Sequence, residues 1–346
     1  MVTTMSSQSQ SRRSSLGSAN GEFSSSEQNP NYFDTAEVWQ RYHDVRPEYP
    51  DELFELIFAY HAKQSKSFEL AADFGSGPGT IVPSLLSRFE RVEASDLNRW
   101  QVDTGRRLLQ ERYGKDRVAF HHGAAGECDW LKDDSADLFI AAEAAQWFDM
   151  EAWGKEAGDK LRPGGTLAMI YYGCNATIID PPEAAPFCNK LFSILFETTW
   201  AQIGFPKNAL LPHVTKFDSV GVSESFFDKS KEERHKWKLP EAVGGPWGLG
   251  ENAPSSRALF EEVPDASQGA QQFEYGGEEG KCLLQRKGWT TDDLMEYIKS
   301  LGMPMQNLTE SPEYQATLDA LHKAVGGPKG TFTAGWWLSL VLATRK

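Results

Sequence analysis

Three glycines at alternate positions follow a short apolar run that ends in an acid. The run covers residues 68–73 and ends at Asp73, and Gly75, Gly77 and Gly79 follow before a helical pattern begins. Glycine lets the backbone turn with positive φ and lets a ligand lie against bare main chain. The N-terminus of a helix offers unpaired N–H groups to such a ligand. The spacing therefore predicts a nucleotide-ligand site in a strand–turn–helix.

A second acid ends the next predicted strand, residues 91–96, at Asp96. An acid at this position can accept both ribose hydroxyls of an adenosine ligand. Dinucleotide sites have the spacing G-x-G-x-x-G, whereas the third glycine comes one residue earlier here. An NAD oxidoreductase is therefore the weaker alternative. Asp96 could also be a helix N-cap, because Asp is favoured there.

These features together resemble the class I S-adenosylmethionine (SAM)-dependent methyltransferases. The run from Tyr42 through Arg46-Pro-Glu-Tyr-Pro50, ahead of a GxGPGT turn, is similar to the trans-aconitate methyltransferase group and its UbiE-like relatives. The resemblance implies SAM as cofactor. It also implies a Rossmann-like α/β fold, with a doubly wound, mostly parallel sheet of seven strands and a substrate cap formed by insertions. In that group the N-terminal helix closes over SAM, so Tyr42 and Arg46 would lie near the methionine end, where Arg can bind a carboxylate. The alternative is that this helix only packs on the core.

The same resemblance implies a set of cofactor-binding residues. Ala124 and Ala125 would present backbone groups to the adenine ring, although Gly126 stands where many relatives have an acid. The full set is Tyr42, Arg46, Asp73, Gly75, Ser76, Gly77, Gly79, Asp96, Leu97, Ala124, Ala125 and Glu143.

The predicted catalytic residues, Gln146 and Trp147, follow the fourth predicted strand, residues 136–142. Relatives have His-Trp-Phe-Asp here, and this chain has Gln146 in place of the histidine. A histidine could be a general base near neutral pH, whereas glutamine can only donate and accept hydrogen bonds. A carboxylate nucleophile needs no base, which suits a site with Gln146. The resemblance to the trans-aconitate group then favours a small carboxylic acid that becomes a methyl ester. A phenol or other secondary metabolite is the alternative substrate class, and a SAM-fold protein that transfers no methyl group is the alternative function.

Composition limits the partners of the chain. The net charge is −14 and the sequence pI is about 5.0, which argues against nucleic acid and against an anionic membrane surface. Four cysteines without a CxxC pair or metal-ligand spacing predict reduced, structural thiols in a cytoplasmic protein. No apolar run reaches 18 residues. We expect a small-molecule substrate, no metal, and a monomer or homodimer.

The predicted organisation is a tail followed by one methyltransferase domain. Residues 1–30 are serine-rich and too polar to form a core, so they predict disorder. Within the domain, residues 31–346, we expect a SAM-binding core, a cap of insertions and a last strand, at 31–173, 174–330 and 331–346. Further expected elements are a sixth strand at 216–227, a long loop at 236–287 and a capped helix from Thr290.

Overall fold

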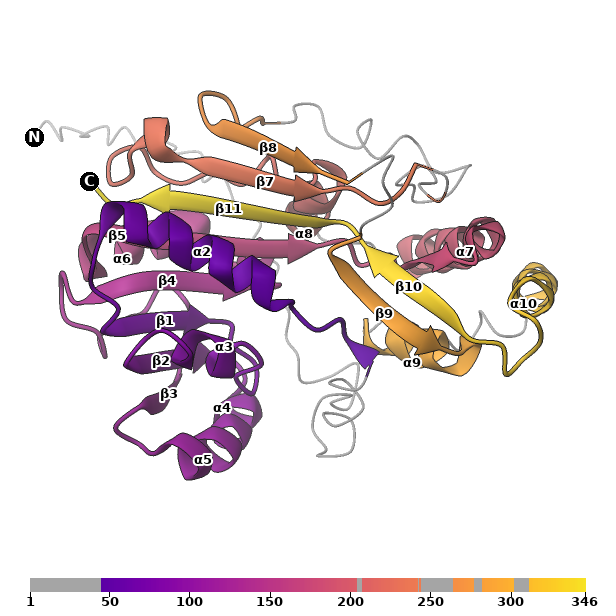
Figure 1. Cartoon of the computed structure of the whole chain (residues 1–346), viewed down its shortest axis with the longest axis horizontal. Coiled ribbons are helices and arrows are strands. Elements are labelled where there is room, and N and C mark those ends of the chain that lie inside the picture. The colour runs from indigo at the N-terminus through magenta and orange to yellow at the C-terminus, as the bar shows by residue number, and fades with distance from the viewer. Residues whose placement is uncertain (1–44, 204–206, 242, 244–263, 277–281, 302–310) are drawn as a thin grey trace, which may run out of the picture.

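The structure is a computed structural model that describes residues 45–203, 207–241, 243, 264–276, 282–301 and 311–346. Side chains are described to residue 197 in the first of these ranges. The predicted tail at residues 1–30 and Tyr42 lie outside the described residues. Within them the chain forms two β-sheets covered by helices (Figure 1).

The larger sheet has strand order β3-β2-β1-β4-β5-β11-β7-β8. Its strands are β1 (Leu70–Phe74), β2 (Arg91–Asp96), β3 (Val118–His122), β4 (Ala136–Ala142), β5 (Leu161–Tyr172), β7 (Glu233–Trp237), β8 (Gln271–Tyr275) and β11 (Leu338–Thr344). Strands β1 to β5 pair in parallel, and β11 runs antiparallel to β5 and to β7. The predicted mostly parallel α/β sheet is confirmed. Seven strands were predicted for this sheet. The strand missing from that prediction is β8, which pairs in parallel with β7 at the edge of the sheet.

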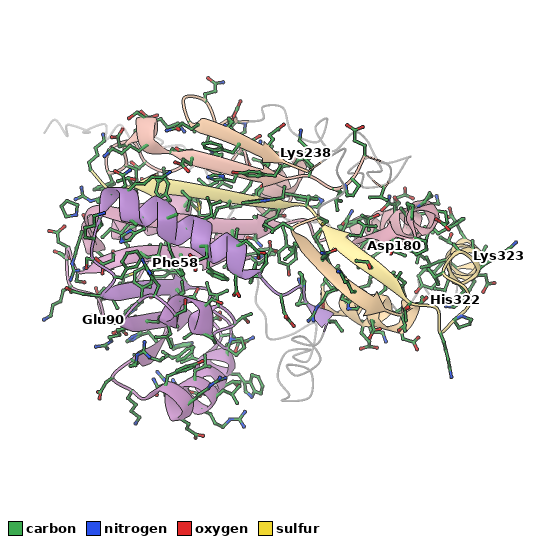
Figure 2. The ribbon with its side chains drawn as sticks, in the orientation of Figure 1. Phe58, Glu90, Asp180, Lys238, His322 and Lys323 are labelled. Atoms are coloured by element: carbon green, nitrogen blue, oxygen red, sulfur yellow. The ribbon has the colours of Figure 1, made fainter. Side chains whose placement is uncertain are left out.

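Helices cover both faces of this sheet. They are α2 (Asp51–Gln64), α3 (Val82–Leu86), α4 (Arg99–Gly105), the π-helical turn η1 (Arg106–Gln110), α5 (Glu111–Tyr113) and α6 (Met150–Lys160). Ile57 and Phe58 of α2 belong to the same apolar core as Ile140, on one face of the sheet. Figure 2 labels Phe58 on this helix. Trp153 of α6 belongs to the core on the other face, with Phe139. Neighbouring residues of β4 thus enter opposite cores, as expected for a strand that is buried on both faces.

A smaller antiparallel sheet, in the order β6-β10-β9, follows the large one. Its elements and helices are β6 (Thr177–Asp180), the short η3 (Pro182–Ala184), α7 (Ala185–Ile203), β9 (Leu284–Trp289), α9 (Thr291–Ser300), α10 (Pro312–Ala324) and β10 (Phe332–Trp336). Phe192 and Phe196 of α7 are 1% and 3% exposed and share a core with Tyr297. These aromatic residues therefore pack in the core and do not face a substrate. The predicted cap at Thr290 is confirmed, because Thr290 and Asp293 form a capping box at the start of α9.

The predicted last strand, at 331–346, is two strands. Trp337 separates β10 from β11, so consecutive strands enter different sheets. This connection joins the small sheet directly to the interior of the large one.

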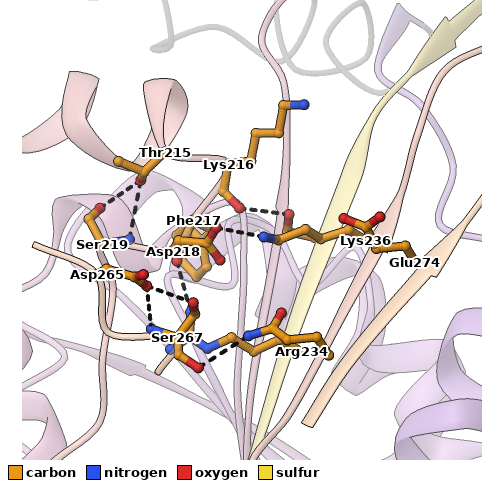
Figure 3. Close-up of polar contacts among 12 residues, drawn as sticks. Thr215, Lys216, Phe217, Asp218, Ser219, Arg234, Lys236, Asp265, Ser267 and Glu274 are labelled. Carbon is orange, nitrogen blue, oxygen red and sulfur yellow. Dashed lines mark hydrogen bonds and ion pairs between the residues drawn. The ribbon is translucent and has the colours of Figure 1, made fainter. Parts of the chain in front are cut away.

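The predicted sixth strand at 216–227 is wrong, and the strand at that position in the sheet is β7. Residues Lys216 and Phe217 both have positive φ, 49° and 73°, which breaks an extended chain. Figure 3 shows how β7 holds the resulting turn. The Arg234 guanidinium donates to the carbonyl oxygens of Phe217 (3.1 Å) and Val220 (2.8 Å), and Lys236 Nζ contacts Asp218 Oδ2 at 2.6 Å.

Candidate active site

Of the three glycines in the turn after β1, Gly77 faces open space. At the other two, neighbouring side chains leave no room for a Cβ atom. The φ angles of Gly75, Gly77 and Gly79 are 63°, 57° and 91°. A Cβ atom on Gly75 would lie 2.4 Å from the Ala144 Cβ, and one on Gly79 would lie 2.5 Å from the Leu109 Cδ1. A Cβ on Gly77 would meet nothing closer than 3.9 Å. Gly77 is therefore the position where a ligand can approach the main chain.

The carboxylate at the end of β2 holds this turn in place. Asp96 Oδ2 accepts the Gly77 N–H at 2.8 Å, and Oδ1 accepts the Asn98 N–H at 2.8 Å. The alternative role of Asp96 as the N-cap of the next helix is wrong, because Asn98 caps α4 and accepts the Trp100 N–H. An ionised carboxylate has about four acceptor positions, so Asp96 retains capacity for ligand hydroxyls.

A cavity of about 220 Å³ lies at the carboxyl ends of β1, β2 and β4, where ligands bind in open α/β sheets. Seven predicted cofactor-binding residues line it, namely Arg46, Asp73, Gly75, Ser76, Gly77, Asp96 and Glu143. The sequence analysis missed Tyr49, Gln101 and Tyr172, which line it as well. Of these, Tyr49 belongs to the motif that carried the resemblance, so its place in the motif could have identified it.

The remaining predicted residues lie elsewhere. Gly79 faces the core, as the Leu109 contact indicates. Leu97, which follows β2 directly, is 72% exposed. Ala124 and Ala125 lie in a turn held next to β2, because the Gly123 N–H donates to the Asp96 carbonyl oxygen at 3.2 Å. None of these residues lines the cavity, and contacts of Leu97, Ala124 and Ala125 with the cofactor stay a prediction.

Three acids give the cavity its electrostatic character. Asp73 Oδ2 is buried and has no hydrogen-bond partner among the described residues. Burial, together with the nearby Asp96 charge, raises the pKa of Asp73 well above its usual value. Burial also raises the pKa of Asp96 and brings that of Glu143 to about 8, against the lowering effects of the Tyr172 N–H and the Arg46 charge. A cationic ligand would relieve this unfavourable burial of carboxyl groups.

This donor and acceptor set fits the cofactor that the resemblance implies. SAM has an ammonium group and a sulfonium, and an acid without a partner can accept from the ammonium. Its ribose hydroxyls match Asp96, and its main body can lie against Gly77. The pyrophosphate of a dinucleotide would instead bring two negative charges next to Asp73, Asp96 and Glu143, which is electrostatically unfavourable.

Arg46 connects the cavity with the smaller sheet. Its NH1 donates to the Tyr172 hydroxyl at 3.2 Å, and its NH2 donates to the Ser300 carbonyl oxygen at 2.8 Å. The guanidinium also lies 5.3 Å from the ring centre of Tyr297. Arg286 donates to the Arg46 carbonyl oxygen. Both terminal nitrogens of Arg46 are thus engaged by the protein, which favours a positioning role. The predicted grip on a ligand carboxylate stays a prediction.

The predicted catalytic residues form a short helical turn, η2 (Ala145–Trp147), beyond β4. Gln146 Nε2 donates to the Glu143 carbonyl oxygen at 3.2 Å, which fixes the amide so that Oε1 points the other way. Gln146 Oε1 is buried and has no partner among the described residues. Trp147 is 59% exposed. Helix α8 (Lys207–Val214) packs against η2.

Two histidines could supply a base if the reaction needs one. His213 of α8 lies close to β5, with Nδ1 at 3.4 Å from the Tyr171 hydroxyl and 3.8 Å from the Cys174 Sγ. Burial lowers the pKa of His213 to about 4. His235 lies on β7, which β11 separates from β5, and its ring contacts Glu233 and Tyr275. Only His213 is near the predicted catalytic turn.

Three further features of the described residues concern metal sites, disulfides and membrane-spanning helices. None of their His, Cys, Asp and Glu side chains form a group of three or more that could hold a metal ion. The four cysteines are free. Among the described residues, no helix combines the length and apolar character that a membrane span requires.

Comparison with known proteins identifies the nucleotide-binding part. Residues 71–165 match the family model described as a methyltransferase domain. The chain is 27% identical to methyltransferase cfoB of Aspergillus candidus over 90% of this chain and 95% of that protein. It is 23% identical to methyltransferase AacuQ of Aspergillus aculeatus, over 92% and 96%. Among solved structures, a proposed type II methyltransferase from Anaeromyxobacter dehalogenans matches with 21% identity and a TM-score of 0.48, over 86% of this chain and 97% of that chain.

Proposed function

Because the chain carries a class I SAM-dependent methyltransferase domain at residues 71–165, we propose that this enzyme methylates a hydroxyl oxygen of a small molecule, in a phenol or enol. The observation that carries the substrate class is the buried Gln146 Oε1, which has no partner among the described residues. A buried acceptor without a partner costs about 1–3 kcal/mol. A substrate O–H would satisfy it.

The orientation of the Gln146 amide decides between substrate classes. The Nε2 group is already directed to the Glu143 carbonyl oxygen, so the oxygen is the group left for a substrate. An amide oxygen can only accept a hydrogen bond. A carboxylic acid is ionised at pH 7 and has no proton to donate, whereas a phenol or enol has one. The trans-aconitate-like substrate favoured by the sequence is therefore less well supported than the hydroxyl alternative.

Trp147 supports an aromatic or conjugated substrate. Its side chain is 59% exposed directly after Gln146, so the indole ring is open to contact with a ligand. Aromatic rings in offset or edge contact gain about 0.5–1.5 kcal/mol beyond buried area. A substrate ring against Trp147 would bring its hydroxyl group next to Gln146.

The remaining residues have roles that follow from their positions. SAM supplies a methyl group on a sulfonium, which is a good leaving group. Asp96 would bind the ribose hydroxyls, Asp73 the ammonium group, and Gly77 would allow close approach to the main chain. Gln146 Oε1 would accept from the hydroxyl of the bound substrate, and Trp147 would hold its ring in line. Such alignment can account for a large part of the rate. Because glutamine cannot take a proton, the hydroxyl proton would pass to water before the ionised oxygen takes the methyl group.

The test is a methyl-transfer assay with SAM whose methyl group is deuterated. The enzyme is incubated separately with panels of phenols, enolic diketones and small carboxylic acids, and products are detected by mass spectrometry. We expect labelled product from the hydroxyl panels. Mild alkali distinguishes the product type, because it cleaves a methyl ester but leaves an aryl methyl ether intact.

A pH profile provides a second criterion. With a phenol the rate should rise from pH 6 to pH 8, because a larger fraction of the nucleophile is ionised. With a carboxylic acid the rate should be flat over this range. Alkali-labile product with a flat profile would contradict the hydroxyl proposal, and SAM binding without transfer to any panel would favour the non-transferring alternative.

A further inference from the structure

A strained residue closes the cavity at the end of β4. Glu143 has φ = 55°, and a non-glycine residue with positive φ is uncommon and costs of order 1 kcal/mol or more. Its side chain lines the cavity, and its Oε1 accepts the Tyr172 N–H. The strained backbone thus turns the Glu143 carboxyl group toward the cavity. In a strand that stayed extended, the chain would continue past the cavity.

The groups that face Glu143 come from several elements and leave its charge only partly balanced. Arg46, from the segment before α2, is the nearby cation, and Asp73, from β1, is a second acid of the same cavity. Tyr171 of β5 is buried and Cys174 beyond it is half-buried, and desolvation raises the pKa of each, the thiol to about 12, so both stay neutral. The Arg46 guanidinium is shared with Tyr172 and Ser300. A ligand with positive charge would supply the missing balance.

SAM and the product that remains after methyl transfer differ in the charge on the sulfur atom. SAM has a positive sulfonium, whereas S-adenosylhomocysteine (SAH) has a neutral thioether, and both have the same ammonium and carboxylate. We propose that Glu143 discriminates between SAM and SAH by losing its proton when the sulfonium binds and regaining one when the thioether is left. This proposal rests on the proposed function, since it requires SAM in this cavity.

The proton balance at Glu143 is closed, and the proton of the substrate hydroxyl is released to water separately. When SAM binds, the O–H bond of the Glu143 carboxyl breaks and the proton passes to bulk water. After the methyl group has left, the sulfur is neutral, and the carboxylate takes one proton back from water. Burial raises the pKa of free Glu143 to about 8, so the free enzyme is protonated here at neutral pH. A nearby cation favours the charged form.

The sign of the pH dependence follows. SAM binding requires proton loss below pH 8, so SAM affinity should rise with pH up to about 8 and then level off. SAH binding requires no such loss at Glu143. The ratio of the SAH to the SAM dissociation constant should therefore increase from pH 6 to pH 8.5. Release of the neutral product is correspondingly easier than loss of SAM.

The experiment is titration calorimetry of the full chain with SAM and with SAH, at pH 7 in two buffers of different ionisation enthalpy. The buffer dependence gives the number of protons released. We expect about one more proton released with SAM than with SAH. Protons that Asp73 releases on binding the ammonium are common to both ligands and cancel in this difference.

The variant Glu143→Gln keeps the side-chain size and an acceptor for the Tyr172 N–H but cannot ionise. It should abolish the difference in released protons and reduce the preference for SAM over SAH about hundredfold at pH 8.5, which corresponds to the two pKa units of interaction that release of nearly a whole proton at pH 7 requires. SAH binding to this variant confirms that its site is folded. Glu55→Gln, on the exposed face of α2, is the matched control and should keep the wild-type difference.

Equal proton release with SAM and with SAH in the wild-type protein would overturn the role of Glu143. The same conclusion would follow if Glu143→Gln kept the wild-type difference between the protons released with the two ligands. If SAM does not bind the wild-type protein at all, the proposed function fails together with this inference. If Glu143→Gln does not fold, the wild-type proton counts alone decide.

Discussion

The Arg46 guanidinium donates to the Tyr172 hydroxyl, with 3.2 Å between NH1 and the oxygen. Arg46 belongs to the segment before α2, and Tyr172 is the last residue of β5. Because NH2 of the same guanidinium donates to the Ser300 carbonyl oxygen at the end of α9, one side chain joins the cavity wall to the smaller sheet. The position of the small sheet and the shape of the cofactor cavity are therefore coupled.

Arg46→Lys should weaken SAM binding and lower the melting temperature together. Lysine keeps the charge but cannot reach Tyr172 and Ser300 with a planar fork. A hydrogen bond from a charged group contributes about 1.5–3 kcal/mol, so loss of one contact should reduce SAM affinity about tenfold or more. Calorimetry and thermal unfolding measure the two effects. Arg88→Lys, which loses only its contact with the Phe68 ring, is the control, and equal behaviour of the two variants would contradict the coupling.

Asp96→Ala should weaken SAM binding by roughly 2–3 kcal/mol, the value of hydrogen bonds to a charged group. The substitution removes the predicted ribose acceptor and also leaves the Gly77 and Asn98 N–H groups without their present acceptor. Asp96→Asn retains one acceptor oxygen and should lose less. SAM affinity within a factor of two of wild type in Asp96→Ala would exclude Asp96 from the binding site.

Gly77 and Gly79 should respond differently to substitution by alanine. At Gly79 the new Cβ would lie 2.5 Å from Leu109 Cδ1 and 2.8 Å from Phe120 Cζ, so Gly79→Ala should lower the unfolding free energy by more than about 1 kcal/mol. At Gly77 the space is open, so Gly77→Ala should mainly lower SAM affinity. Gly77→Val should abolish binding in a folded protein. Thermal unfolding with and without SAM separates the two losses, and normal SAM titration of folded Gly77→Val would refute the site.

Gln146→Leu should lower kcat/KM for a hydroxyl substrate about 10- to 100-fold and leave SAM affinity unchanged. Leucine has a similar size but offers no acceptor to the substrate O–H, and an unpaired partner costs about 1–3 kcal/mol. Steady-state kinetics and SAM calorimetry are the measurements. Gln146→Glu restores an acceptor and should recover part of the activity, whereas full activity of Gln146→Leu would remove Gln146 from the substrate site.

His213 should make the protein less stable in acid. Its pKa is about 4 in the folded state, lowered by burial from 6.5, so the unfolded chain binds more protons between these values. Stability is therefore complete above pH 6.5 and falls as pH decreases towards 4, by about 3 kcal/mol in total. His213→Asn should be less stable at pH 7 but should show a shallower decline from pH 6.5 to 4. Denaturant unfolding at several pH values measures the slope, and parallel curves for the two proteins would contradict this assignment.

The sequence predicted the parallel half of the large sheet because each strand there is an apolar run between turn signals. Strand β7 escaped prediction for a physical reason. Its residues Glu233, Arg234, His235 and Lys236 are charged or titratable, so they suggest a solvated segment. Arg234 is nevertheless 1% exposed, because its guanidinium is paired with Glu232 Oε1 at 2.6 Å and with main-chain carbonyl oxygens. Only the folded environment supplies these partners.

The candidate site was predictable where local motifs determine it. Gly75, Gly77, Asp73 and Asp96 belong to strand ends whose neighbours are close in sequence. Tyr172 and the orientation of the Gln146 amide depend instead on contacts made after folding, with Arg46 and with the Glu143 carbonyl oxygen. Spacing in the sequence cannot specify which atom of an amide is left without a partner.

The place of β11 inside the large sheet determines the order in which the sheet can assemble. β11 pairs with β5 on one side and with β7 on the other, and β7 in turn is the neighbour of β8. Residues 338–344 must therefore find β5 across a long stretch of intervening chain, which makes loop closure slow. Strands β7 and β8 are connected to β1 to β5 only through β11 among the described strands. Folding of the large sheet should show a fast phase for β1 to β5 and a later phase for the other three strands.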